Sequence, residues 1–264
     1  MAFLAVPGPF DFALTTERFR AFGVDRVNLW HEGGLHRVVE GREVRIEAAE
    51  NGVEVDPLDA DTEPVVRRLL GLPFDLDGFY RWAVDDDVLA GIVRRLAGFR
   101  PPLTPNPFEM LVGAIAAQQV SLFSATAIRN RLIERFGVRA GNAWAFPTRE
   151  RLAAAGEDEL VALGFSRRKS EYVVGLARST LDLDALGALP DDEVRAQIVA
   201  LRGLGEWTAE WFLARHLARP HAWPAGDLAL RKAVVPLDVD RARIRFHPYQ
   251  NLSAHYLLLS NRVP

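Results

Sequence analysis

Cysteine is absent from this chain of 264 residues. The absence excludes disulfides, thiolate zinc sites, iron–sulfur clusters and cysteine nucleophiles. The chain also lacks any run of about 18 apolar residues, so we expect no membrane span and no membrane partner. Its first ten residues, MAFLAVPGPF, lack the basic start and long apolar core of a secretory signal peptide. These features favour a cytoplasmic protein.

Lysine is almost absent as well, because only Lys169 and Lys232 occur among 32 basic residues. This scarcity limits any chemistry that needs an amine nucleophile. The net charge is −3, yet it is unevenly spread: residues 1–99 carry 11 basic and 18 acidic residues, whereas residues 100–264 carry 21 and 17. An acidic front and a basic back indicate two parts with different tasks.

Hydrophobic periodicity predicts an α+β protein. In the front part, alternating segments at 35–39, 43–47 and 52–55 predict antiparallel strands, and short helices are expected at 15–22 and 62–70. We expect no strand after residue 80. The prediction is a small antiparallel-sheet N-terminal domain over 1–78, followed by an all-helical domain over 79–264. The helices expected there cover 87–96, 108–136 (two helices with Ser121 as the cap between them), 149–155, 157–163, 168–180, 191–201, 206–219, 228–234 and 251–259.

Residues 201–205, Leu-Arg-Gly-Leu-Gly, separate two predicted helices. Glycine permits unusual backbone angles and the close approach of another backbone, so this segment predicts a tight hairpin. The free N–H groups that begin the next helix can then bind a phosphate without a cationic side chain. The same residues also fit an ordinary helix hairpin with glycine at its cap.

A Gly/Pro loop ending in a carboxylate, Trp-Pro-Ala-Gly-Asp at 223–227, follows about twenty residues later. With this loop and the hairpin, the chain resembles the helix-hairpin-helix–Gly/Pro–Asp superfamily of DNA base-excision glycosylases. Within it, the chain is similar to the DNA-3-methyladenine glycosylase II family. Residues 108–121 (FEMLVGAIAAQQVS), 146–148 (FPT) and 164–169 (GFSRRK) also match. The resemblance covers roughly 75–260 and, more weakly, the front part, and it implies a helix-hairpin-helix glycosylase core.

The resemblance implies that Asp227 is the catalytic residue. In the family, the matching aspartate stabilises the positive charge that develops on the sugar while the base departs. Such a transition state needs a fixed anion in a site of low dielectric constant. Asp227 also precedes a predicted helix, so it can simply cap that helix. The two roles are compatible.

The resemblance also implies an aromatic pocket for a base flipped out of the duplex, formed here by Trp207, Trp211 and Phe246. Trp207 and Trp211 are four residues apart and share one helix face. Trp211 takes a place where the family has an aromatic pocket residue, although both tryptophans could instead belong to the core. Superfamily members that also cut the strand have a lysine at the position of Trp207. We therefore expect base release without lyase activity, and no cofactor.

Several residues are candidates for contact with damaged double-stranded DNA. Gln119 matches the position that fills the gap left by the flipped base, although Gln118 and Gln119 could instead cap a helix end. Arg167 and Lys169 belong to a basic cluster that binds phosphate or is only solvated. Further candidates are Ser121, Gly203, Gly205 and Thr208. The resemblance also implies Na⁺ or K⁺ on the backbone carbonyls of Leu201 and Leu204.

The leading hypothesis is a monofunctional glycosylase that excises 3-methyladenine and 7-methylguanine in base-excision repair. It would act as a monomer in the cytoplasm, associated with the nucleoid. Because Phe246 and Gln119 depart from the family pattern, a glycosylase for oxidised or deaminated bases is an alternative. A third is a non-catalytic protein that uses the hairpin as a phosphate clamp. Asp227 argues against the clamp, because an anion near DNA weakens binding.

Overall fold

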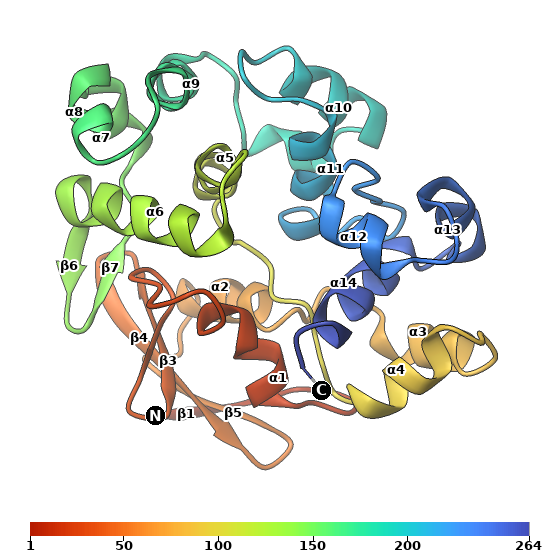
Figure 1. Ribbon diagram of the computed structural model, residues 1–264. Coiled ribbons are helices and arrows are strands. Elements are labelled where there is room, and N and C mark those ends of the chain that lie inside the picture. Colours follow the sequence, from red (N-terminus) through yellow and green to blue (C-terminus); the bar gives the residue numbers. More distant parts are fainter. Residues whose placement is uncertain (264) are drawn as a thin grey trace.

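An antiparallel sheet forms the N-terminal part of the computed structural model, which describes residues 1–263 (Figure 1). Its strand order is β1-β5-β4-β3-β2. Ile46 lies opposite both Leu35 and Val55, and all three side chains are fully buried, because alternate residues face the core. The predicted strands are confirmed and two more flank them. The five are β1 (Ala2–Ala5), β2 (Leu29–His31), β3 (Gly34–Val39), β4 (Arg42–Ala49) and β5 (Gly52–Asp56).

Three helical segments accompany the sheet: α1 (Phe12–Thr16), the 3₁₀ turn η1 (Glu17–Phe19) and α2 (Thr62–Leu69). The helix expected at 15–22 therefore begins earlier and ends earlier. The side chain of Asp11 accepts the N–H of Leu14 and so fixes the start of α1.

The rest of the chain is mainly helical. Its helices are α3 (Leu76–Ala83), α4 (Leu89–Arg95), α5 (Pro107–Ala117), α6 (Leu122–Phe136), α7 (Arg149–Ala154), α8 (Glu157–Ala162), α9 (Arg167–Arg178), η2 (Ala185–Ala188), α10 (Asp191–Val199), α11 (Glu206–Arg215), α12 (Leu228–Ala233), α13 (Val239–Arg245) and α14 (Gln250–Ser260). None of the helices within residues 1–263 is long and apolar enough to cross a bilayer.

One expectation was wrong, because a two-stranded hairpin follows residue 80. Strands β6 (Val138–Ala140) and β7 (Ala143–Ala145) pair antiparallel, and β7 contacts β3. Strands of three residues are too short to show an alternating pattern. The hairpin is held by contacts with the front part, which a local pattern does not reveal. Trp144 donates its backbone N–H to the carbonyl of Arg26 at 2.9 Å.

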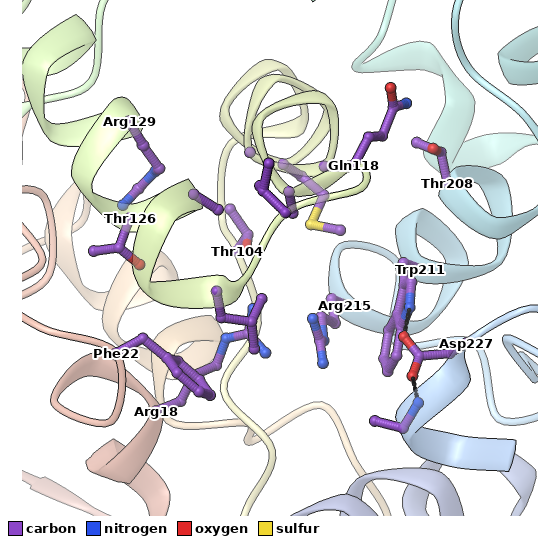
Figure 2. A pocket seen from close by; sticks show the side chains of 18 of the residues that line it. Arg18, Phe22, Thr104, Gln118, Thr126, Arg129, Thr208, Trp211, Arg215 and Asp227 are labelled. Carbon is purple, nitrogen blue, oxygen red and sulfur yellow. Dashed lines mark hydrogen bonds between the residues drawn. The ribbon is translucent and has the colours of Figure 1, made fainter. Parts of the chain in front are cut away.

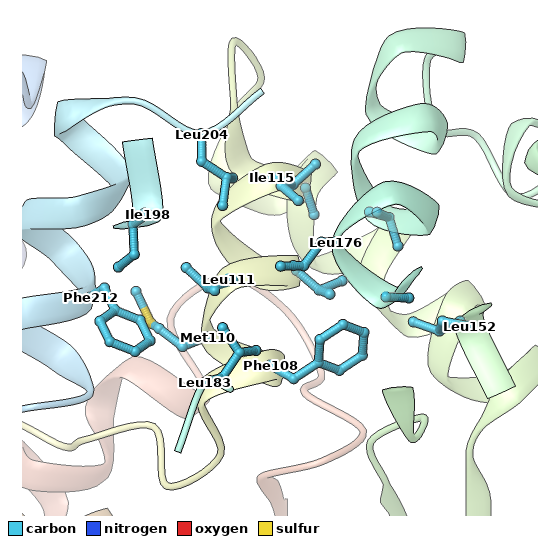
Figure 3. Close-up of a cluster of buried hydrophobic side chains, with 14 of the residues drawn as sticks. Phe108, Met110, Leu111, Ile115, Leu152, Leu176, Leu183, Ile198, Leu204 and Phe212 are labelled. Atoms are coloured by element: carbon cyan, nitrogen blue, oxygen red, sulfur yellow. The ribbon is translucent and has the colours of Figure 1, made fainter. Parts of the chain in front are cut away.

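Hydrophobic side chains form three buried clusters. Helix α5 lies at the centre of the largest one, where nine of its 11 residues are buried (Figure 3). The second joins α3 and α4 to the C-terminal helices, and the third fills the front part. The change from the third cluster to the second falls between Leu70 and Phe74, shortly before the expected domain boundary at 78. That boundary stays a prediction.

Buried ion pairs connect the front part to the helical part. Glu109 on α5 accepts from Arg37 on β3 at 2.6 Å and from Arg129 on α6 at 2.7 Å. Arg129 also donates to Asp25, in the loop before β2, at 2.9 Å. The side chain of Glu109 is only 2% exposed, so its charge depends on both arginines.

Replacing Glu109 with alanine should lower the free energy of unfolding by about 3–5 kcal/mol, because Arg37 and Arg129 keep buried charges without a partner. Glu134→Ala provides the control. Glu134 also joins the two parts, through Arg26 at 2.7 Å, but both side chains are about 40% exposed. Its loss should cost less than about 1 kcal/mol. Urea unfolding measures both values, and equal losses would show that the buried network has no special role.

Candidate functional site

A cavity of about 920 Å³ lies between the front part and the helical part (Figure 2). Its walls come from the segment after α1, from α5 and α6, from α11 and the start of α12, and from the end of α14. Segments that are far apart in the sequence therefore build one site. The cavity is large enough for a small organic ligand.

Asp227 has a fully hydrogen-bonded carboxylate in the wall of this cavity. Its Oδ1 accepts the backbone N–H groups of Ala229 at 2.9 Å and Leu230 at 3.1 Å, which makes it the N-cap of α12. Its Oδ2 accepts the indole N–H groups of Trp207 and Trp211, each at 3.1 Å. Asp227 is thus both a helix cap and a pocket residue.

Local sequence explains how α11 and α12 meet at this carboxylate. Trp207 and Trp211 are one helical turn apart, so both indoles reach the same oxygen, and the expectation that they share a face is confirmed. The N–H of Asp227 donates to the carbonyl of Pro224 at 2.8 Å, which closes a tight turn. The turn packs beside Trp207: an added Cβ at Gly226 would lie 3.7 Å from the Cβ of that residue, which is an ordinary van der Waals contact.

Phe246 does not line the pocket, so this expectation was wrong. Its side chain is fully buried and packs on Trp223, with ring centroids 5.9 Å apart, in the cluster shared by α3, α4 and the C-terminal helices. Phe246 caps the C-terminus of α13, and this position turns it into the core. Leu258 and Arg262 line the pocket on the C-terminal side instead.

The predicted hairpin joins α10 to α11. Gly203 has a φ of +86°, and a Cβ there would lie 2.2 Å from the ring of Tyr172. Gln118 donates its side-chain N–H to the carbonyl of Gly203 at 2.8 Å, and Leu204 donates its N–H to the carbonyl of Leu201 at 3.1 Å. The Leu201 and Leu204 carbonyls remain a prediction as cation ligands. Residues 1–263 contain no cluster of three or more histidine or acidic side chains that could hold a metal.

The loop between α5 and α6 carries exposed side chains at the mouth of the pocket. Gln119 is exposed and has a φ of +56°, which is uncommon for residues other than glycine. Ser121 caps α6 by accepting the N–H of Ser124. Leu122 and Phe123 are also exposed, Phe123 by 62%, although our sequence reasoning passed over both. Gln119 as the wedge stays a prediction.

The remaining candidates for contact with DNA are Lys169, Thr208 and Arg167, and each has contacts or burial within the protein. Lys169 is 9% exposed, and its ammonium donates to the carbonyl of Ala116 at 3.0 Å, at the end of α5. Its contact with a phosphate stays a prediction. Thr208 is only 1% exposed but lines the cavity, so its contact with DNA stays a prediction. Arg167 is exposed and pairs with Asp158 at 3.0 Å, as expected for a solvated face.

Sequence reasoning missed the arginines and the aromatic residue that complete the pocket. Arg18 and Phe22 come from the front part, whose charge made a role in the site unexpected. Arg215 lies with its guanidinium carbon 3.6 Å from the ring centroid of Trp211. Burial and the charge of Arg262 lower the pKa of Arg18 to about 10. Burial and Arg18 lower the pKa of Arg215 well below its usual value.

Substituting Gly203 with alanine should lower the free energy of unfolding by about 2–4 kcal/mol, because the new Cβ clashes with Tyr172 and the positive φ is strained. Gly205→Ala is the control in the same hairpin. Gly205 has no heavy atom within 4 Å of an added Cβ and an ordinary extended backbone. Thermal and urea unfolding measure both. Similar stabilities would contradict the close approach at Gly203.

Comparison with known proteins agrees with this arrangement. The "DNA-3-methyladenine glycosylase" of Bacillus subtilis is 31% identical over 169 residues, covering 60% of this chain and 56% of the relative. The "Probable bifunctional transcriptional activator/DNA repair enzyme AlkA" of Mycobacterium tuberculosis is 32% identical over 204 residues, 72% of this chain and 41% of the relative. The chain thus spans about half the length of the first curated relatives.

A solved structure, the 3-methyladenine DNA glycosylase from Archaeoglobus fulgidus, matches 99% of this chain and 98% of its own, with a TM-score of 0.88 and 26% identity. Residues 112–244, half of the chain, match the model for an HhH-GPD superfamily base excision DNA repair protein. This match includes α11, the turn before Asp227 and α12. The chain therefore belongs to the HhH-GPD superfamily of base excision DNA repair proteins.

Proposed function

We propose that the protein is a DNA N-glycosylase that releases a damaged base by hydrolysis and leaves an abasic site. One observation carries the proposal: a carboxylate in a cavity wall, fixed by two indole N–H groups and two backbone N–H groups. The family and the names of the relatives support it. A base inside the duplex cannot reach such a cavity, so it must be flipped out.

Asp227 would act mainly through its charge. While the bond between sugar and base breaks, positive charge develops on the sugar, and a fixed anion stabilises it without reorganisation. A carboxylate has about four acceptor sites, two on each oxygen. All four are used by Trp207, Trp211, Ala229 and Leu230, so no site is left to take a proton from water in this conformation. Water would attack the sugar and lose its proton to solvent.

Alkylated purines, such as 3-methyladenine and 7-methylguanine, are the first substrates to test, because several relatives and a structural neighbour are named 3-methyladenine glycosylases. The ring of Phe22 provides an aromatic surface on one side of the cavity and Trp211 on the other (Figure 2). Aromatic surfaces bind flat, electron-poor bases by stacking. Oxidised or deaminated bases are the alternative.

The positions of both lysines favour base release without strand cleavage. An amine nucleophile must touch the sugar, and in the superfamily it comes from the position of Trp207. Lys169 is bound to the carbonyl of Ala116, and Lys232 is exposed on α12 and does not line the cavity. Neither ammonium is placed for attack. The product would therefore be an intact strand with an abasic site.

Double-stranded DNA would contact the loop between α5 and α6 together with the hairpin. Gln118 joins these two elements, so they form one surface beside the cavity. Gln119, Leu122 and Phe123 are the exposed side chains that could fill the gap left by a flipped base. A solved relative, the Schizosaccharomyces pombe 3-methyladenine DNA glycosylase Mag1 in complex with abasic DNA, matches 71% of the chain with a TM-score of 0.60. We propose that a monomer binds in this way.

Asp227→Asn should reduce the release of bases from methylated duplex DNA by at least about 100-fold, since the amide keeps the helix cap but carries no charge. Chromatography of released bases measures the rate. The DNA strand that the wild type has acted on should break only after alkali treatment, because no lysine can form a covalent intermediate with the sugar.

Asp238→Asn is the matched control. Asp238 caps α13 through the N–H groups of Asp240 and Arg241, in the same way as Asp227 caps α12, but it does not line the cavity. The Asp238→Asn variant should release bases at a rate within about twofold of the wild-type rate. Undiminished release by Asp227→Asn would refute the role of the carboxylate. Binding of DNA without release by the wild type would favour the non-catalytic clamp.

A further inference from the structure

We infer that Glu210 is a positioning residue, which holds the Gly/Pro loop at 223–227 on α11 and thereby sets the place of Asp227. The inference rests on the proposed glycosylase function and adds to it a residue outside the cavity, since Glu210 is not among the residues that line it. Glu210 would act on the reaction only through the loop. The argument depends on the hydrogen bonds at the two ends of that loop.

Glu210 belongs to the same helix as the two tryptophans that hold Asp227. It stands three residues after Trp207 and one before Trp211, so its side chain leaves α11 on the flank beside the indoles. Its Oε2 accepts the backbone N–H of Trp223, the first residue of the Gly/Pro loop, at 2.8 Å. The indoles bind the carboxylate of the last residue. One helix therefore fixes both ends of this loop.

Trp223 anchors the start of the Gly/Pro loop in the core. It is 3% exposed, its indole N–H donates to the carbonyl of Val239 at 3.0 Å, and its ring packs on Phe246. Its backbone carbonyl accepts the N–H of Ala225 at 2.7 Å. Buried backbone N–H groups need an acceptor, and Glu210 supplies the one for Trp223. Without that carboxylate, the backbone at the start of the loop would have to shift to find another acceptor.

Arg195 on α10 orients the carboxylate of Glu210. Its Nε donates to Oε1 of Glu210 at 2.6 Å, and the two side chains are only 21% and 16% exposed. Arg195 also pairs with Asp192, whose side chain is 97% exposed. The pair with Glu210 is better shielded from water and salt, so it is the stronger constraint. Because α10 and α11 are the two arms of the hairpin, one carboxylate joins both arms to the Gly/Pro loop.

The place of Asp227 decides the rate in the proposed reaction. A fixed anion stabilises the charge on the sugar only from a set position, and a displacement of about 1 Å can cost about 100-fold in rate. The indole N–H groups orient the carboxylate, but the backbone of the Gly/Pro loop determines where the residue starts. Loss of Glu210 should therefore slow the chemical step and leave the binding of DNA at the cavity mouth nearly unchanged.

The test compares Glu210→Ala, which removes the acceptor, with Glu210→Gln, which keeps an oxygen for the N–H of Trp223. Base release from methylated duplex DNA is measured under single turnover with saturating protein, and titration of a duplex with an abasic site gives Kd. Asp191→Ala is the control. Asp191 on α10 pairs with Arg219, just after α11, at 3.1 Å, and both side chains are about 30% exposed. This pair joins the same two arms away from the Gly/Pro loop.

Glu210→Ala should slow release at least about tenfold with Kd within about twofold, whereas Glu210→Gln should stay within about threefold and Asp191→Ala within about twofold of the wild-type rate. At saturating protein the rate constant reports folded molecules only, so partial unfolding does not imitate this result. A smaller effect of Glu210→Ala, an equal loss in Glu210→Gln, or a Kd that weakens as much as the rate overturns the inference and leaves the proposed function intact. A wild type that releases no base refutes the proposed function itself.

Discussion

Four N–H groups hold one carboxylate, and the rest of the site depends on this arrangement. Two of them begin α12, and two are indole groups from successive turns of α11. Neither helix alone could orient Asp227 at the cavity wall. The turn at 224–227 leads into α12, and the hairpin that ends at Gly205 leads into α11. In the proposed reaction, the fold would keep a negative charge in place while the charge of the substrate changes.

The acidic front part contributes to the structure of the site, a role that its charge alone did not suggest. Its sheet is tied to α5 and α6 by the buried contacts of Glu109 and Arg129, and the segment that follows α1 brings Arg18 and Phe22 into the cavity. Acidic and basic side chains from the two parts pair at their junction. The cavity is thus shared by both parts, and the front part supplies a wall that the matched family region, 112–244, does not contain.

Much of the fold and the centre of the site could be predicted from local patterns. Strand alternation, helix caps and the hairpin glycines act over a few residues, and the spacing of Trp207 and Trp211 fixed their common face. Phe246 and Lys169 could not be placed in this way. Whether an aromatic ring at the end of a short helix, such as Phe246, faces the core or a pocket depends on the turn at that helix end. The ammonium of Lys169 binds the carbonyl of Ala116, which lies 53 residues away in the sequence. Arg18 and Arg215 meet only through tertiary packing.

The most direct test of the central claim removes the indole N–H groups and keeps the aromatic rings. In Trp207→Phe, Trp211→Phe and the double variant, single-turnover base release from methylated DNA is measured together with binding to abasic DNA. If a fixed carboxylate stabilises the transition state, each single change should slow release about tenfold or more while binding weakens little, and the double change should slow it further. Unchanged release in the double variant, in a folded protein, would show that the orientation of Asp227 does not govern the reaction.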